Sequence, residues 1–106
     1  MPKYMVVASY SAEGIKGVLR EGGSKRRETV AEMVSNLGGK LEAFYYAFGH
    51  DDVYSIVDLP DNATAAAFAL HIAASGTIDV RVVVLLTPQD IDEAAKMKMW
   101  FRPPGA

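Results

Sequence analysis

The sequence predicts an α+β fold of the ferredoxin-like type, with a four-stranded antiparallel sheet, helices on one of its faces and one further helix at the C-terminus. Strand-like and helix-like segments follow the order β-α-β-β-α-β-α. The two central strand segments are separated only by the turn Gly49-His50-Asp51-Asp52, as in a hairpin. A βαββαβ string of this kind gives a two-layer architecture.

The first half of the chain predicts a strand, an interrupted helix and a second strand. Residues 4–10 are apolar and β-branched, which favours a strand. Ser11 is a suitable cap for the helix that follows, and Gly22-Gly23 breaks that helix before a second piece begins. The second piece ends at Gly38-Gly39, and residues 40–48 form the next strand.

The second half predicts a hairpin strand over 53–59, a helix over 62–74, a strand over 78–86 and a last helix ending near Met99. Thr87-Pro88-Gln89-Asp90 is typical of a helix start. We expect one domain over residues 1–100 and a flexible tail over 101–106, where two prolines prevent a helix from continuing.

Composition excludes several kinds of function. The 106 residues carry a net charge of −2, which gives no general attraction to nucleic acid or to an anionic membrane. The absence of cysteine excludes disulfides, thiolate catalysis and cysteine-bound metal. No signal peptide or membrane-spanning segment is predicted, so we expect a cytoplasmic protein, and no motif indicates a cofactor or a metal.

Both faces of the predicted sheet are apolar. By strict alternation, one face of the second strand carries Leu41, Ala43 and Tyr45, and the other carries Phe44, Tyr46 and Phe48. Because helices cover only one face, the other needs a partner, and we predict a homo-oligomer paired through the sheet. The alternative is that the last helix folds over its own sheet.

The helix over 62–74 is rich in alanine and apolar around its whole circumference. Such a helix is normally buried on all sides. It is expected either to pack tightly on the sheet alone or to be buried on its outer side by an oligomer contact as well.

Several segments in order resemble the GYD-domain family, at matching intervals over most of residues 4–90. They are Tyr10-Ser11-Ala12-Glu13-Gly14-Ile15, Gly38-Gly39-Lys40-Leu41, Phe44 to Gly49, Asp52 to Asp61 and Ala73-Ala74-Ser75-Gly76. In the turn, Asp51 stands where the family has its Tyr. The resemblance implies a dimeric α+β barrel architecture and supplies no catalytic residues.

Five polar residues are candidates for lining a ligand site: Tyr45, His50, Asp52, His71 and Arg81. His50 beside two carboxylates suits a general base, although the same residues suit a solvated turn. His71 lies on an apolar helix with no acidic or His partner one turn away, so a core histidine is the plainer interpretation. Arg81 either binds a carboxylate or pairs with Asp58.

Two further groups of residues can be interpreted either as part of a binding site or as ordinary structure. Lys25-Arg26-Arg27 follows three small residues at a helix start and forms either an anion cradle with a mobile flap or a solvated basic turn. The aromatic residues and the late Met97, Met99, Trp100 and Phe101 line a pocket or pack on a partner.

Two functions of different classes follow. In the first, a homo-oligomer binds a small, partly apolar molecule between sheet and helices, with cofactor-free acid–base chemistry if it is an enzyme. In the second, the chain is a non-catalytic oligomerisation or regulatory module. A pocket with converging polar groups would favour the first.

Overall fold

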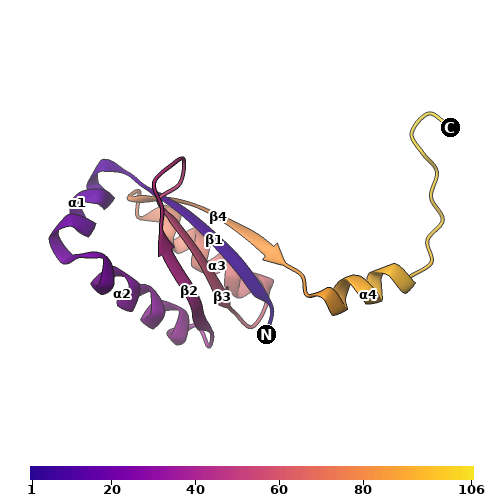
Figure 1. The fold of residues 1–106 in the computed structure, drawn as a ribbon, viewed down its shortest axis with the longest axis horizontal. Coiled ribbons are helices and arrows are strands. Elements are labelled where there is room, and N and C mark those ends of the chain that lie inside the picture. The colour runs from indigo at the N-terminus through magenta and orange to yellow at the C-terminus, as the bar shows by residue number, and fades with distance from the viewer.

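The computed structural model describes every residue from Met1 to Ala106. Its sheet has the strand order β2-β3-β1-β4 with all neighbours antiparallel, which confirms the ferredoxin-like prediction. In Figure 1, α3 lies behind the strands, and no helix lies in front of them. The elements are β1 (Lys3–Tyr10), α1 (Ala12–Glu21), α2 (Gly23–Asn36), β2 (Lys40–Tyr46), β3 (Val53–Asp58), α3 (Asn62–Ala74), β4 (Ile78–Leu85) and α4 (Pro88–Lys96).

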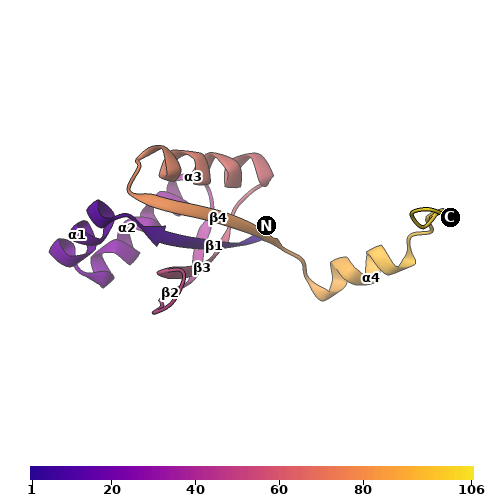
Figure 2. The ribbon, with the colours of Figure 1, turned by 90° about the horizontal axis from the view of Figure 1, so that it is seen from above.

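The core lies between the sheet and the two helices α2 and α3, and Figure 2 shows α3 along one side of β1 and β4. Tyr4 is 1% exposed, and its hydroxyl donates to Asn62 Oδ1 at 2.7 Å, so its polar atom is satisfied inside the core. This bond ties the first strand to the start of α3. The core residues are Tyr4, Val6, Val30, Val34, Val57, Leu59, Ala65 and Phe68.

The predicted break between α1 and α2 is confirmed at Gly22, whose φ of 87° is readily adopted only by glycine. Ser11 caps α1 by accepting a hydrogen bond from Gly14 N–H at 3.2 Å. A Cβ on Gly14 would lie 2.4 Å from the carbonyl oxygen of Thr77. Glycine at this position therefore lets α1 lie directly against the chain that enters β4.

Strict alternation along β2 is wrong, because the strand contains a β-bulge between Leu41 and Ala43. The extra residue Glu42 places Leu41 and Phe44 on the same, helix-covered side, where both pack against the core. Phe44 is therefore not on the uncovered face, and Phe48 lies beyond the strand, fully exposed.

Within one chain α3 packs on the sheet alone, which is the first of its two expected arrangements, and burial of its outer side by an oligomer contact stays a prediction. Only Ala65 and Phe68 are buried, and Leu70 on the outer side is 69% exposed. The helix packs on the sheet through one stripe and leaves its small outer side chains uncovered.

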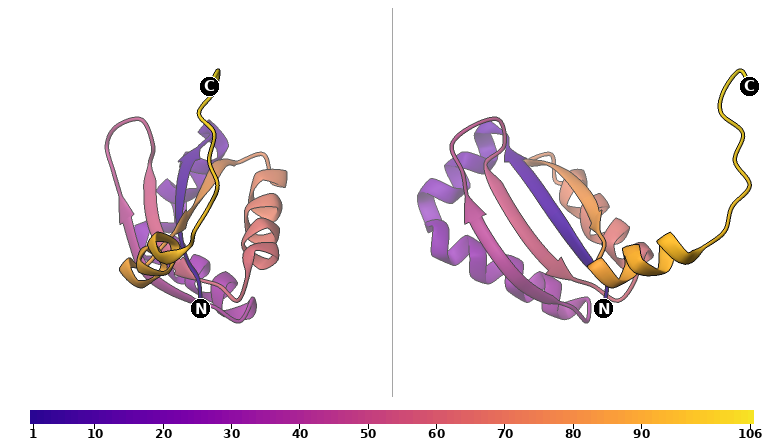
Figure 3. Two further views of the ribbon diagram at one scale, coloured as in Figure 1. Left: turned by 90° about the vertical axis from the view of Figure 1, so that its right-hand side faces the viewer. Right: turned by 45° about the vertical axis from the view of Figure 1, so that its right-hand side comes forward.

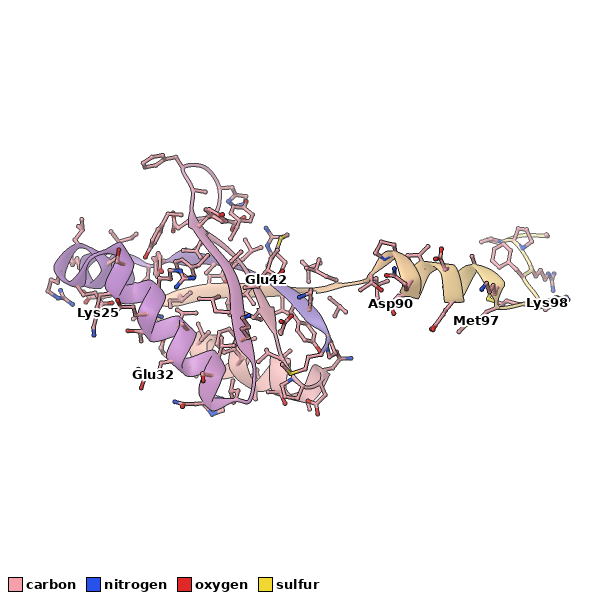
Figure 4. All side chains as sticks on the ribbon, turned by 60° about the horizontal axis from the view of Figure 1, so that its bottom comes forward. Lys25, Glu32, Glu42, Asp90, Met97 and Lys98 are labelled. Atoms are coloured by element: carbon pink, nitrogen blue, oxygen red, sulfur yellow. The ribbon has the colours of Figure 1, made fainter.

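The last helix does not fold over its own sheet, and it ends at Lys96, before the expected Met99. Residues 86–106, which we call the arm, extend away from the body in Figures 1 and 3, so the molecule measures 56 × 33 × 24 Å. No residue of α4 is buried. Figure 4 shows Asp90, Met97 and Lys98 on the arm, far from Glu42 on the sheet.

Candidate functional site

The sheet face turned away from α2 and α3, which we call the open face, has no covering helix in the chain. The register of the four strands places one set of apolar residues on it: Met5, Val7, Ala43, Tyr45, Tyr54, Ile56, Val83 and Leu85. Tyr45 is 71% exposed. The predicted apolar character of the uncovered face holds at these positions, and the same face also carries Lys3, Ser9, Asp58, Asp79 and Arg81.

Asp51 organises the polar end of the open face. Its Oδ1 accepts a hydrogen bond from Ser9 Oγ at 2.9 Å, and its Oδ2 accepts one from Arg81 Nη2 at 2.8 Å. The Tyr54 hydroxyl approaches Oδ2 at 3.4 Å. The Ser9 bond, and then the Arg81 bond, hold the pKa of the Asp51 carboxyl below its ordinary value. Asp51 thus joins the β2–β3 loop to β1 and β4.

The neighbouring Asp52 fixes the same loop through the backbone. Its Oδ2 accepts a hydrogen bond from Tyr10 N–H at 2.8 Å, and its own N–H donates to the carbonyl of Ala8 at 2.9 Å. These bonds continue the pairing of β1 beyond the end of β3. His50, two residues before Asp52, is exposed and forms no hydrogen bond through its ring. Asp52 therefore has a structural task at this position.

The predicted pair of Asp58 with Arg81 is wrong. Asp58 does lie on the open face with Tyr54 and Ile56, but its Oδ1 pairs with Lys3 Nζ at 2.8 Å. Lys3 also contacts Glu42 Oε2 at 2.8 Å, so one ammonium group bridges two carboxylates. These two hydrogen bonds raise the pKa of Lys3, with Asp58 contributing most.

His71 lies in the other layer of the molecule. It lines a shallow groove with Met33 and Leu37 of the α2 region and Phe68 of α3. Its Nδ1 lies 2.8 Å from the carbonyl oxygen of Ala67 on the preceding turn. The structure brings Arg81 to the loop that carries His50 and Asp52, with Tyr45 on the same face, and leaves His71 apart. Contact of any of the five with a ligand stays a prediction.

A cavity lies between the sheet and the helices. The sequence predicted a ligand site in this layer but did not predict the residues that line the cavity. Its volume is about 30 Å³, which holds a water molecule and is far below the roughly 300–1,000 Å³ of ordinary ligand pockets. Apolar side chains dominate its wall, and Arg26 is its only charged residue. At the same end, a cleft of about 210 Å³ opens under α1, again lined by Tyr10 and Arg26.

No three His, Asp or Glu side chains come together in a way that would hold a metal ion. None of the helices has both the length and the apolar run needed to cross a membrane.

Comparison with known proteins gives the family. The family model described as "GYD domain" matches residues 4–95, which is most of the chain. The chain belongs to the GYD domain family. The predicted resemblance is thereby confirmed. No solved structure matches the chain.

A curated relative of this GYD domain comes from Thermus thermophilus and is named "Glutamine synthetase and cystathionine beta-lyase binding protein". It is 23% identical over 91 residues, covering 86% of this chain and 95% of the relative. That relative is thus named for binding two enzymes. The family match ends at residue 95, so the apolar arm tip with Met97, Met99, Trp100 and Phe101 lies beyond it.

Proposed function

We propose that this GYD domain is a non-catalytic assembly protein of the cytoplasm. Two copies pair through their open faces as a dimeric α+β barrel, and the pair binds a larger protein. The open face itself supports this proposal, because apolar and aromatic side chains from all four strands share it and no helix covers it. Extended apolar patches on small proteins mark interaction sites.

The area of the open face can be compared with the area that a stable dimer interface buries. Four strands about 4.8 Å apart, each about 25 Å long, present roughly 500 Å² per copy. Face-to-face pairing would then bury about 1,000 Å² in total, which is the lower bound for a specific interface. A standard interface buries about 1,600 Å², so a further contact of several hundred Å² is needed.

The arm is the segment that can supply this further contact. We propose that it packs against a second copy of the chain. Trp100 is 81% exposed and Met99 is 78% exposed, although such residues belong to the centres of interfaces. The arm leaves β4, an edge strand of the sheet, and projects beyond its own domain. In a face-to-face pair it would lie along the partner.

Self-association is tested by placing a charge on the open face. Tyr45→Asp should convert the dimer to a folded monomer, because Tyr45 is exposed and its loss costs the single chain little. Leu19→Asp is the matched control: Leu19 is 79% exposed on α1, away from the open face. The readout is mass by light scattering. A folded Tyr45→Asp protein of unchanged dimeric mass, or a monomeric wild type, would overturn the pairing.

Binding of a protein partner is proposed from the name of the Thermus relative. Purified protein should co-sediment with glutamine synthetase or cystathionine β-lyase from the same host in analytical ultracentrifugation. Binding lost in the Tyr45→Asp monomer would show that the pair is the binding unit. Failure of the wild-type dimer to shift either enzyme would contradict the partner assignment and leave the dimer intact.

A second candidate function is favoured by one observation. The cavity between sheet and helices adjoins the cleft under α1, and Tyr10 and Arg26 line both. This arrangement supports binding of a small, partly apolar molecule. Acid–base chemistry on such a molecule is the finer part of this candidate, and turnover of a bound compound would test it.

A further inference from the structure

Arg26 is a half-buried cation that forms no ion pair with another side chain. It lies in the first turn of α2 and is half-buried, whereas its neighbours Lys25 and Arg27 are exposed. Its guanidinium takes part in none of the four ion pairs and none of the side-chain hydrogen bonds of the protein. A guanidinium has five N–H donors, so this group is available to an anion.

Three hollows meet at this side chain. Arg26 lines the apolar cavity, the cleft under α1, and a groove of about 260 Å³ that continues toward His71 and Ser75. Ser55, the other polar residue of the cavity wall, already donates its hydroxyl hydrogen to the carbonyl of Val6 at 3.0 Å. The cation therefore stands where an apolar interior opens to water.

Two tyrosines flank the same place. Tyr10 lines both the cavity and the cleft, and Tyr46 donates its hydroxyl hydrogen to the carbonyl of Gly23 at 3.1 Å. Burial raises the pKa of Tyr46, Tyr10 adds to the rise, and the charge of Arg26 opposes it. The three side chains thus act on one another. Glycine at 23 leaves room for the Tyr46 ring, since a Cβ there would lie 3.0 Å from it.

We propose that the mouth formed by Tyr10 and Arg26 binds a small monocarboxylate with an apolar body. This proposal rests on the second candidate function and names its site and ligand class. Arg26 takes the carboxylate through two parallel N–H donors, and Tyr10 donates its hydroxyl hydrogen to the same group. The apolar body lies in the cleft against Val18 and Ile78, because the cavity of about 30 Å³ is too small to hold it. Glu13 and Glu21 line the same cleft and restrict the carboxylate to the end at Arg26. The cleft volume limits the ligand to a single ring or a short branched chain.

The test uses the full chain in its native oligomeric state, with phenylacetate as probe and its neutral analogue phenylacetamide as control. Amide resonances followed by nuclear magnetic resonance should shift at Tyr10, Arg26 and Ile78, saturating with a dissociation constant of about 1 mM. Phenylacetamide should bind about tenfold more weakly, because it lacks the charge that strengthens the bond to Arg26.

Variants separate the site from general charge effects. Arg26→Gln should weaken phenylacetate binding about tenfold, and Arg26→Lys should weaken it nearly as much because the two-pronged geometry is lost. Arg27→Gln, which removes an exposed cation one residue away, should leave binding within about twofold. Equal losses in Arg26→Gln and Arg27→Gln would overturn the assignment.

The outcomes distinguish the inference from the function on which it rests. Saturable binding of both probes in the cleft under α1, unaffected by Arg26→Gln, would overturn the carboxylate site and keep small-molecule binding. Absence of saturable shifts at Tyr10, Arg26 and Ile78 with either probe at roughly 20 mM would overturn both.

Discussion

Asp51 and Arg81 lie 30 positions apart in the sequence and form an ion pair at 2.8 Å across the end of the open face. The carboxylate of Asp51 accepts three contacts, from Ser9, Arg81 and Tyr54, and so joins a loop to three strands. Asp51 therefore holds the β2–β3 loop against the polar end of the open face.

The Asp51 pair makes stability depend on pH in the acid range. The pKa of Asp51 is lower in the folded chain than its ordinary value of 3.8, so its contribution is fully present above that value. The contribution is lost as pH falls through the lower folded pKa. Asp51→Asn should therefore flatten the loss of unfolding free energy below about pH 4, measured by urea titration.

Part of the acid dependence should persist in that variant, because Thr64 hydrogen bonds also hold the pKa of Asp61 down. Asp92→Asn is the control, since Asp92 is exposed on the arm and forms no ion pair. An acid slope identical in Asp51→Asn and the wild type would contradict the prediction.

Two glycines of α1 should respond in opposite directions to alanine. At Gly17 an added Cβ meets only the end of the Arg20 side chain at 3.8 Å, so Gly17→Ala should raise the free energy of unfolding by about 0.5–1 kcal/mol. Gly14→Ala would collide with the Thr77 carbonyl and should lower it by about 1–3 kcal/mol. Chemical denaturation measures both, and equal effects would show that α1 moves freely on the sheet.

Removal of the buried Tyr4 hydroxyl should lower the free energy of unfolding by about the contribution of one hydrogen bond. Tyr4→Phe keeps the packing and loses the bond to Asn62, so the unfolding free energy should fall by about 1 kcal/mol. Tyr45→Phe should change it by less than about 0.5 kcal/mol, because the exposed Tyr45 hydroxyl bonds to nothing within the chain. A neutral Tyr4→Phe would mean that water replaces the lost hydroxyl as the hydrogen-bond partner of Asn62.

The helix of the arm depends on its first residues. Thr87 and Asp90 form a reciprocal capping box, with Asp90 N–H donating to Thr87 Oγ1 at 3.1 Å and Thr87 N–H donating to Asp90 Oδ2 at 2.9 Å. Thr87→Ala should cost α4 about 1 kcal/mol and weaken the proposed dimer several-fold, measured by sedimentation equilibrium. Thr87→Ser keeps the cap and should leave the dimerisation constant unchanged. An unchanged dimerisation constant in Thr87→Ala would remove α4 from the interface.

The sequence was sufficient for the order of elements because each has a local signal. The Gly22-Gly23 break, the Ser11 cap and the Thr87-Pro88 start depend only on backbone sterics and near-neighbour hydrogen bonds, and all three are present. The position of the arm was not predictable in this way. A helix with an apolar stripe is compatible with its own sheet or with another chain, and local pattern does not distinguish them.

The polar contacts were the least predictable. Ser9, Asp51 and Arg81 meet only because β1 lies between β3 and β4, so their neighbourhood depends on strand order rather than on spacing. Arg26 was one of three consecutive cations in the sequence. Helical periodicity placing it toward Val30 is the signal that distinguishes it from Lys25 and Arg27.

The bulge at Glu42 divides β2 into two halves whose side chains follow opposite alternation. One additional residue thereby decides which aromatic ring belongs to the interior and which lies on the open face. Deletion of Glu42 would give β2 regular alternation with Phe44 still inside and Tyr45 still outside, whereas a strand that kept Glu42 without a bulge would exchange the surroundings of these two rings. At this strand, residue count carries as much structural information as residue type.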